Sequence, residues 1–446
     1  MKARRNLIQI WLLCAAMVQA VTSGAQPVTK IAAGGYHSLF LKSDGSLWAM
    51  GFNNFGQLGD GTYNNTNRPE QIVASNVTAI AAGLHHSLFL KSDGSLWAIG
   101  LNDSGQLGDG TYNNANRPEQ IVSGGVTMIA AGGYYSLFLK SDGSLWAMGH
   151  NSNGQLGDGT FTKNNRPEQI VASNVTAIVG GGFHSMFLKS DGSLWAMGNN
   201  LVGQLGDGTH NNTNRPEEIV ASNVTAITAG HMHSLFLKGN GSLWAMGTNG
   251  FGQLGDGTYN NTNGPEQIVA SNVMAIAAEG KSDHSLFLKS AGSLWAMDLN
   301  SKGQLGDGTF GNTNKPEWIV ASNVTAIAGG GGHSLFLKSD GSLWAMGDNQ
   351  FGQLGDGTYN QTNRPEQIVS PLVYDRIYYQ LSSGTNMQLS FLGMATTNYA
   401  LDRSRSLSSP NWIPQTTNPA NSIGVVLFTN KPDTTTNNFW RIRSVQ

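Results

Sequence analysis

Residues 77–122 read VTAIAAGLHHSLFLKSDGSLWAIGLNDSGQLGDGTYNNANRPEQIV, and this stretch recurs along the chain with little change. Its most constant part, GQLGDGT, begins at Gly56, Gly105, Gly154, Gly203, Gly252, Gly303 and Gly352. The interval is 49 residues at every step but one, which is 51. The tryptophan of GSLW keeps the same interval, at Trp48, Trp97, Trp146, Trp195, Trp244, Trp295 and Trp344. Self-similarity at a period near 50 residues indicates a repeat architecture, so the seven units must be interpreted together.

The unit itself is predicted to be all-β. Short apolar runs alternate with clusters of Gly, Asn, Asp and Pro, which predicts strands at 77–82, 87–91, 96–100 and 119–122. Between the second and third strands, Asp93 and Gly94 indicate a tight hairpin, because Asp-Gly accepts the positive φ values of such turns. Each unit is therefore expected to be a four-stranded antiparallel meander.

The number of units predicts the architecture. One meander cannot bury both of its faces, whereas seven meanders arranged radially pack each sheet on the next. We expect a seven-bladed β-propeller over residues 27–370. The repeated tryptophans listed above are expected to lie between blades, where replacing one with alanine would cost about 3–5 kcal/mol.

Four motifs follow one another in the units: AAGxxHSLFL, GSLWAMG, NxxGQLGDGT and RPEQIV. Together they resemble the repeat of the regulator of chromosome condensation family, and the resemblance covers about 345 of the 446 residues. It implies the same seven-bladed propeller. The eukaryotic namesake is an exchange factor for a small GTPase and binds chromatin. These uniform repeats lack the features on which exchange depends, so we do not expect guanine nucleotide exchange.

The two ends of the chain differ from the repeats. A basic start, an apolar stretch over residues 7–18 and small residues before residue 26 resemble a secretory signal peptide, cut after Ala20 or Ala25. Residues 1–25 contain Cys14, the only cysteine, so the mature chain would have no disulfide. With the family resemblance, this leader predicts a secreted bacterial member with no membrane span in the mature chain. Residues 371–446 carry further apolar runs between turn residues and are expected to form a small β-sandwich-like domain.

Composition argues against nucleic acid as a partner. Without residues 1–25 the chain keeps 23 basic against 28 acidic residues, a formal charge of −5. The repeats contain no basic run, and phosphate binding needs clustered Lys and Arg. We expect no nucleic acid partner.

The repeated polar residues are interpreted as structural. The aspartate of GQLGDGT is present in all seven units and is expected to complete a turn rather than bind calcium, because Asp60-Gly61-Thr62 supplies too few oxygen donors. Six units place His before Ser, and the third has Tyr135. A buried histidine bonded to its neighbouring strand is favoured over a metal site. The sequence shows no nucleophile-and-base pair and no phosphate-binding glycine loop, so we expect no enzyme activity and no cofactor.

The positions at which the units differ fall into two groups, just before the histidine and just after WAMG. In a meander, the loop after strand one and the loop after strand three emerge on the same side. The varied residues should therefore share one face of the disc, where a partner would be recognised. The expected partner-binding residues are aromatic anchors and two charged residues of the sixth unit: Tyr36, Phe52, Phe55, Phe183, Phe251, Phe351, Lys281 and Asp283. The alternative is that these loops are unconstrained turns in solvent.

The sixth unit departs most from the others. It has two extra residues within 279–283, Ala291 for Asp, Asp298 for Gly and Trp318 for Gln. Trp318 is a candidate contact residue for a partner or for the tail domain. A hydrolase or lyase acting on extracellular polysaccharide is the alternative function, and Glu279, Lys281, Asp283 and Asp298 are the one polar cluster that this function could use. The favoured function is a monomeric, secreted or cell-surface scaffold that binds a protein or a cell-surface glycan through its loop face.

Overall fold

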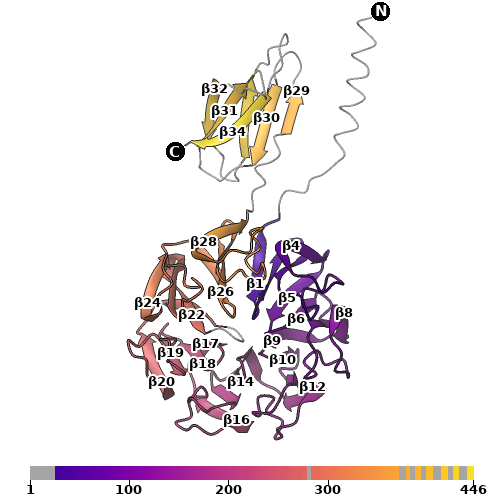
Figure 1. Cartoon of the computed structure of the whole chain (residues 1–446), viewed down its shortest axis with the longest axis vertical. Helices are drawn as coiled ribbons and strands as arrows, with labels where there is room; N and C mark the ends of the chain where they lie inside the picture. Colours follow the sequence, from indigo (N-terminus) through magenta and orange to yellow (C-terminus); the bar gives the residue numbers. More distant parts are fainter. Residues whose placement is uncertain are drawn as a thin grey trace, which may run out of the picture. The chain divides into compact units, whose positions relative to one another are not determined.

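A computed structural model describes residues 26–278 and 283–370, together with six strands of the tail. Residues 27–369 form one compact unit, and the tail strands belong to a second. The first unit is a seven-bladed β-propeller of four-stranded antiparallel blades, as predicted (Figure 1). Each blade is one consecutive set of four strands, paired in sequence order.

The strands recur at four positions in the blades. The first strands, which contact those of neighbouring blades, are β1 (Val28–Ala33), β5 (Val77–Ala82), β9 (Val126–Ala131), β13 (Val175–Gly180), β17 (Val224–Ala229), β21 (Val273–Ala277) and β25 (Val324–Gly329). The second strands are β2 (His37–Lys42), β6 (His86–Lys91), β10 (Tyr135–Lys140), β14 (His184–Lys189), β18 (His233–Lys238), β22 (His284–Lys289) and β26 (His333–Lys338). The third are β3 (Leu47–Gly51), β7 (Leu96–Gly100), β11 (Leu145–Gly149), β15 (Leu194–Gly198), β19 (Leu243–Gly247), β23 (Ser293–Asp298) and β27 (Leu343–Gly347). The fourth, on the outer circumference in Figure 1, are β4 (Thr66–Val73), β8 (Ala115–Val122), β12 (Asn164–Val171), β16 (Thr213–Val220), β20 (Thr262–Val269), β24 (Thr313–Val320) and β28 (Thr362–Val369).

The first and third strands of the second blade have the predicted bounds. The second strand begins one residue earlier, at His86, and the outer strand begins at Ala115 rather than residue 119. The predicted hairpin is present: Oδ1 of Asp93 accepts hydrogen bonds from the backbone N (2.9 Å) and Oγ (2.6 Å) of Ser95, and Gly94 has φ 76°. In the sixth blade, where Ala291 replaces the aspartate, a short 3-10 helix over Ser290–Gly292 takes the place of this turn. In the fifth blade Asn240 makes the same two bonds through its Oδ1, so a side-chain oxygen at this position selects the turn conformation.

The core lies between blades. Leu39 and Leu41 of β2 pack against Phe89 of the second blade, while Phe40 between them packs against Leu335 of the seventh. Alternate residues of one strand thus face two different blades, and both faces must be apolar. The phenylalanine is buried in every blade, and its removal from water contributes about 1.5–3 kcal/mol per blade.

The repeated tryptophans pack at the margin of these clusters and are only partly buried. Trp195 stacks on buried Phe187, with ring centroids 6.1 Å apart. The ammonium group of Lys189 lies over the Trp195 ring, 3.6 Å from the ring centroid. Nε1 of Trp195 donates to Oγ of Ser193 at 2.9 Å. The fully buried wedge between blades is therefore the phenylalanine, and the tryptophan is its half-buried cover.

A belt of hydrogen bonds joins each blade to the next. His37 Nε2 lies 2.9 Å from Oγ of Ser87, one blade further on. Ser87 Oγ donates its only proton to the carbonyl of Gln57 at 2.8 Å, so the histidine must be the donor in the first bond. The same bond links His86, His184, His233, His284 and His333 to the serine of the following blade. The predicted structural role of the histidines is confirmed.

The belt also closes the ring, because His333 of the seventh blade bonds Ser38 of the first at 2.9 Å. In the third blade Tyr135 takes the histidine position, and its hydroxyl donates to the backbone carbonyl of His184. Burial lowers the pKa of His86, His184 and His284 to about 3 and that of His233 and His333 to about 4. The belt histidines are therefore neutral at pH 7.

The repeated aspartate of GQLGDGT completes a turn, as predicted. Oδ1 of Asp60 accepts from the backbone N of Thr62 at 2.8 Å and from Nδ2 of Asn53 at 3.0 Å, and Oδ2 accepts from Oγ1 of Thr62 at 2.7 Å. Equivalent bonds hold the aspartates of the other blades. These carboxylates are thus committed to local structure.

The described tail strands form two antiparallel sheets. One has the order β29-β30-β33, from Tyr378–Leu381, Met387–Leu392 and Val425–Asn430. The other has the order β32-β31-β34, from Ile413–Pro419, Asn398–Ser404 and Phe439–Val445. The proposed signal peptide, residues 1–25, lies outside the described residues.

Candidate partner-binding face

The two varied loops of each blade lie side by side. In the first blade the backbone N of Phe52, after β3, donates to the carbonyl of Tyr36, before β2, at 2.9 Å. The second blade has the same bond between Leu101 and His85 at 2.9 Å. The inference that both groups of varied residues share one face is therefore correct. We call this surface the loop face.

Aromatic rings from three blades meet on the loop face in a cluster that we call patch one. Its members are Tyr36, Phe52, Phe55, His85 and Phe351. The ring centroids of Phe52 and Phe351 are 4.7 Å apart, and those of Phe55 and His85 are 4.9 Å apart. All five side chains are half-buried. Offset and edge-on ring contacts of this kind stabilise a cluster by about 0.5–1.5 kcal/mol per pair, so the loops are mutually packed.

A second cluster, patch two, lies on the third to fifth blades. It consists of Tyr134, His150, Phe183 and His231. Phe183 is its centre, with His231 at 5.8 Å, His150 at 6.0 Å and Tyr134 at 6.5 Å between ring centroids. Burial lowers the pKa of His150 and raises that of Tyr134, so both are uncharged at pH 7. Two of the four rings of patch two, Tyr134 and His150, are therefore uncharged.

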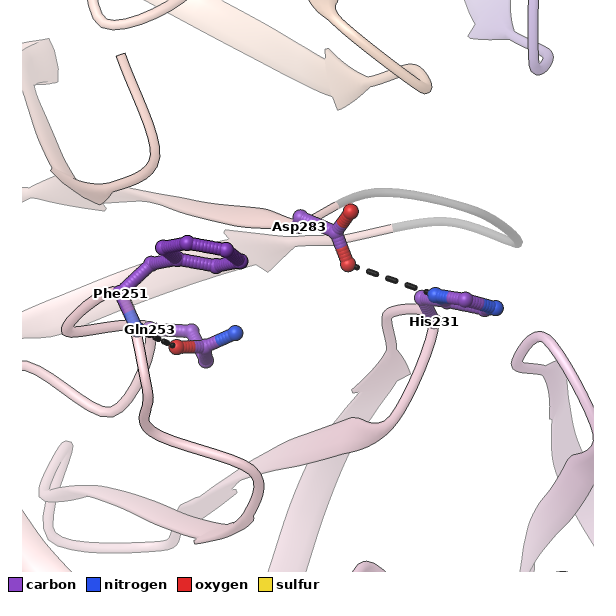
Figure 2. A network of polar contacts seen from close by, with 4 residues as sticks. All are labelled: His231, Phe251, Gln253 and Asp283. Atoms are coloured by element: carbon purple, nitrogen blue, oxygen red, sulfur yellow. Dashed lines mark hydrogen bonds and ion pairs between the residues drawn. The ribbon is translucent and has the colours of Figure 1, made fainter. Parts of the chain in front are cut away.

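An acidic corner adjoins patch two. Oδ1 of Asp283, just before β22, lies 3.4 Å from Nδ1 of His231 in the fifth blade (Figure 2). The ring of Phe251 lies near the same carboxylate, and its backbone N donates to Oε1 of Gln253 at 2.9 Å (Figure 2). Phe251 is 46% exposed, whereas the rings of patches one and two are half-buried. The corner thus combines one carboxylate, one imidazole and one open ring.

Asp298 stands where six blades have glycine. It ends β23 with φ 103°, while the equivalent Gly51 has φ 109° and Gly247 has φ 106°. Both carboxyl oxygens are buried without a hydrogen-bond partner among the described residues. Burial, and then the nearby Asp283 carboxylate, raises the pKa of Asp298 well above its ordinary value. A buried, neutral carboxyl with no access to solvent is a poor match to the charged carboxylate pair of a glycosidase.

The part of the chain that the structure describes contains neither a metal-binding cluster nor a membrane-spanning helix. No group of three or more His, Cys, Asp or Glu side chains in this part of the chain is placed to hold a metal ion. Among the same residues, no helix has the length and apolar character needed to cross a lipid bilayer.

The sequence located part of this face. Tyr36, Phe52, Phe55 and Phe351 come together in patch one, Phe183 lies in patch two, and Asp283 and Phe251 form the acidic corner. Lys281 and Glu279 lie outside the described residues. Trp318 is 62% exposed, and its Nε1 donates to the carbonyl of Val320 at 3.1 Å. The sequence reasoning missed four ring residues, which occupy the same varied positions as those it selected: His85, Tyr134, His150 and His231.

The family follows from sequence matches as well as from the fold. The RCC1-like domain matches residues 124–392, which is more than half of the chain. The regulator of chromosome condensation (RCC1) repeat matches residues 28–57 and 77–106, and a second model of this repeat matches 44–90 and 93–139. The chain belongs to the RCC1-like propeller family.

Solved propellers show the same fold at low sequence identity. Human WBSCR16 is 23% identical with a TM-score of 0.66, and the match covers 74% of this chain and 96% of that protein. Yeast RCC1 (Prp20), solved bound to Kap60, is 20% identical with a TM-score of 0.66, over 80% and 87%. A second structure of Prp20p from Saccharomyces cerevisiae, described with its binding properties to Gsp1p and histones, is 22% identical over 80% and 89%, with a TM-score of 0.66.

One curated relative matches a single stretch. The X-linked retinitis pigmentosa GTPase regulator homolog of Caenorhabditis elegans is 54% identical over 41 residues, which is 9% of this chain. The match spans 3% of that relative's length.

Proposed function

We propose that this chain is an exported interaction scaffold that binds a protein through patches one and two of its loop face. The observation that carries the proposal is the local loss of sevenfold symmetry. The hydrogen-bond belt and the apolar core recur from blade to blade. The ring clusters of patches one and two, in contrast, form where the varied loops of neighbouring blades carry aromatic or histidine side chains. A unique surface on a repeated frame suits recognition of one specific partner.

The chemistry of the patches supports protein binding. Half-buried aromatic rings already held by their neighbours lose little conformational freedom on contact, and such rings are enriched at the centres of interfaces. Yeast Prp20, which shares the fold, binds the proteins Kap60 and Gsp1p and also histones. By analogy in fold, binding of a protein is favoured over the polysaccharide hydrolase or lyase alternative, since Asp298 is buried and Asp283 is paired with His231.

The proposal that the chain is exported is based on residues 1–25, which resemble a signal peptide. Expression in a bacterial host, followed by cell fractionation and N-terminal sequencing of the product, tests this export. We expect the mature chain to begin at residue 21 or 26 and to leave the cytoplasm. An uncleaved cytoplasmic product would contradict this part of the proposal. Sedimentation of the same product tests the proposed monomer.

A double substitution tests the binding site. Phe52→Ser with Phe351→Ser removes the closest ring pair of patch one, whose centroids are 4.7 Å apart. Crosslinked capture from envelope and extracellular fractions should then lose the partner seen with the unaltered chain. Met274→Ser is the matched control, because Met274 is apolar and 71% exposed but lies outside both patches. Equal capture by the double variant and the unaltered chain would refute the assignment.

A further inference from the structure

One exposed aromatic residue follows GQLGDGT in six of the seven blades. These side chains are 46–54% exposed, although the rest of the large apolar side chains are mostly buried. They are Tyr63, Tyr112, Phe161, Tyr259, Phe310 and Tyr359. Each lies three residues before the start of the outermost strand of its blade, so the six rings lie around the circumference.

A basic residue of the next blade packs on the turn that immediately precedes each ring. A Cβ on Gly61 would meet Nη2 of Arg117 at 2.5 Å, so this guanidinium packs on the glycine two residues before Tyr63. The backbone N of Gly61 also donates to the carbonyl of Asn116 at 2.8 Å. Five further junctions repeat the arrangement with Arg166, Arg215, Lys315, Arg364 and Arg68. We call each aromatic residue with its basic neighbour a rim notch.

The two members of a notch are lost together. At the junction of the fourth and fifth blades, His210 replaces the aromatic residue and Gly264 replaces the basic one. The blades still join there as elsewhere, since the backbone N of Gly208 donates to the carbonyl of Asn263 at 2.8 Å. The junction therefore does not need the ring or the cation. Their paired loss indicates that the two residues share a role other than joining the blades.

The chemistry of a notch fits an uncharged, hydroxyl-rich ligand. The one ion pair among the described residues joins His231 to Asp283, so the rim guanidinium groups are not engaged in ion pairs there. Each notch also contains the aspartate of its turn, and in the second blade the exposed Glu119 of the outer strand lies beside this aspartate, Asp109. Mixed charge of both signs disfavours an anionic or cationic polymer. A sugar ring places its C–H face on an aromatic ring and offers hydroxyls to guanidinium, amide and carboxylate groups.

Repetition favours a repeating ligand. A protein partner presents one surface, whereas a polysaccharide presents the same unit many times, and several weak identical notches then act together. Lys163 already covers the ring of Tyr112, with Nζ 4.4 Å from the ring centroid, which leaves the other five notches open. We propose that the rim notches bind a neutral polysaccharide, one short segment in each. This site is separate from the loop face and does not depend on the function proposed for it.

Affinity electrophoresis in gels containing a soluble polysaccharide tests the proposal. Three neutral probes are used, a mixed-linkage β-glucan, a galactomannan and a dextran, with polygalacturonate as the anionic probe. The fivefold variant changes the open rings to alanine: Tyr63→Ala, Phe161→Ala, Tyr259→Ala, Phe310→Ala and Tyr359→Ala. These side chains are about half exposed, and thermal unfolding verifies that the variant folds. Met274→Ala is the matched control.

We expect at least one neutral probe to retard the unaltered chain, with affinity reduced at least about tenfold in the fivefold variant and unchanged in the control. The monosaccharide from which the bound probe is built should bind at least about 100-fold more weakly than the polymer, because avidity requires that one ligand occupy several notches at once. Absence of retardation by all three neutral probes, retardation by polygalacturonate alone, or equal retardation of the variant would overturn the proposal. Loss of a captured protein by the fivefold variant, with no glycan bound, would identify the rim as a protein surface and would also overturn it.

Discussion

Lowering the pH from 7 to 5 is expected to destabilise the propeller through its belt histidines. Their pKa values fall to about 3 or 4 because burial penalises the charged ring, and the pKa of His37 falls in the same direction. In the unfolded chain histidine has a pKa of about 6.5. The unfolded state therefore binds more protons below that value. Stability is complete above about pH 6.5 and is lost as the pH falls toward the folded pKa.

The magnitude follows from the pKa difference. Each histidine contributes a slope of about 1.4 kcal/mol per pH unit, so at pH 5 each costs about 2 kcal/mol. The five histidines whose pKa falls to about 3 or 4 together cost on the order of 10 kcal/mol, and His37 adds a cost in the same direction. This sum is comparable to the whole stability of a typical domain at about 5–15 kcal/mol. Acid should therefore unfold the propeller well above pH 3.

Guanidinium unfolding followed by tryptophan fluorescence at pH 7 and pH 5 measures this loss. His86→Tyr removes one titrating group and reproduces the natural Tyr135, since Gly83 backs residue 86 as Gly132 backs residue 135. The variant should lose about 2 kcal/mol less than the unaltered chain between the two pH values. His210→Tyr is the control, because His210 is exposed and lies outside the belt. Equal losses in the His86→Tyr variant and the unaltered chain would refute the reasoning.

Three further substitutions test the packing, each by its thermal unfolding midpoint. Asp298→Gly should stabilise the propeller by about 1–3 kcal/mol, because it removes a buried carboxyl group without a hydrogen-bond partner and removes the backbone strain of a non-glycine residue at φ 103°. A lower midpoint would show that the carboxyl group is needed. Gly247→Ala, at the equivalent position of the fifth blade, should destabilise the propeller by more than about 2 kcal/mol, because the alanine Cβ would lie 2.5 Å from the carbonyl oxygen of Met232. An unchanged midpoint would contradict that geometry. Trp195→Ala should cost about 3 kcal/mol through loss of the stack on Phe187, and a neutral effect would mean that the indole contributes no packing.

The sequence was sufficient for the fold because every local signal repeats. Asp93 and Gly94 fix a hairpin whose bonds lie within a few residues, and the alternation around Phe89 follows from burial on both sides. The outer strand was predicted too short, because its first residues are polar and carry no apolar signal. The role of the tryptophans was only partly predicted, since sequence does not show that Phe187 is buried deeper than Trp195.

The candidate site was less predictable for a physical reason. Patch one joins residues from the first, second and seventh blades, and its existence depends on closure of the ring. His85 and His231 gain their place from ring contacts with other blades, which their own loops do not specify. The buried state of Asp298 likewise could not be inferred, because glycine at six equivalent positions predicts no room for a side chain.

Position-specific photocrosslinking tests the central claim most directly. A benzophenone side chain is placed at residue 55 in patch one, and in a second chain at exposed residue 92 in a hairpin turn away from both patches. Each chain is irradiated with the extracellular and envelope fractions of the source cells. The proposed scaffold should give a discrete protein adduct from residue 55 and none from residue 92. The same adducts from both positions, or no adduct from residue 55, would contradict recognition through the loop face.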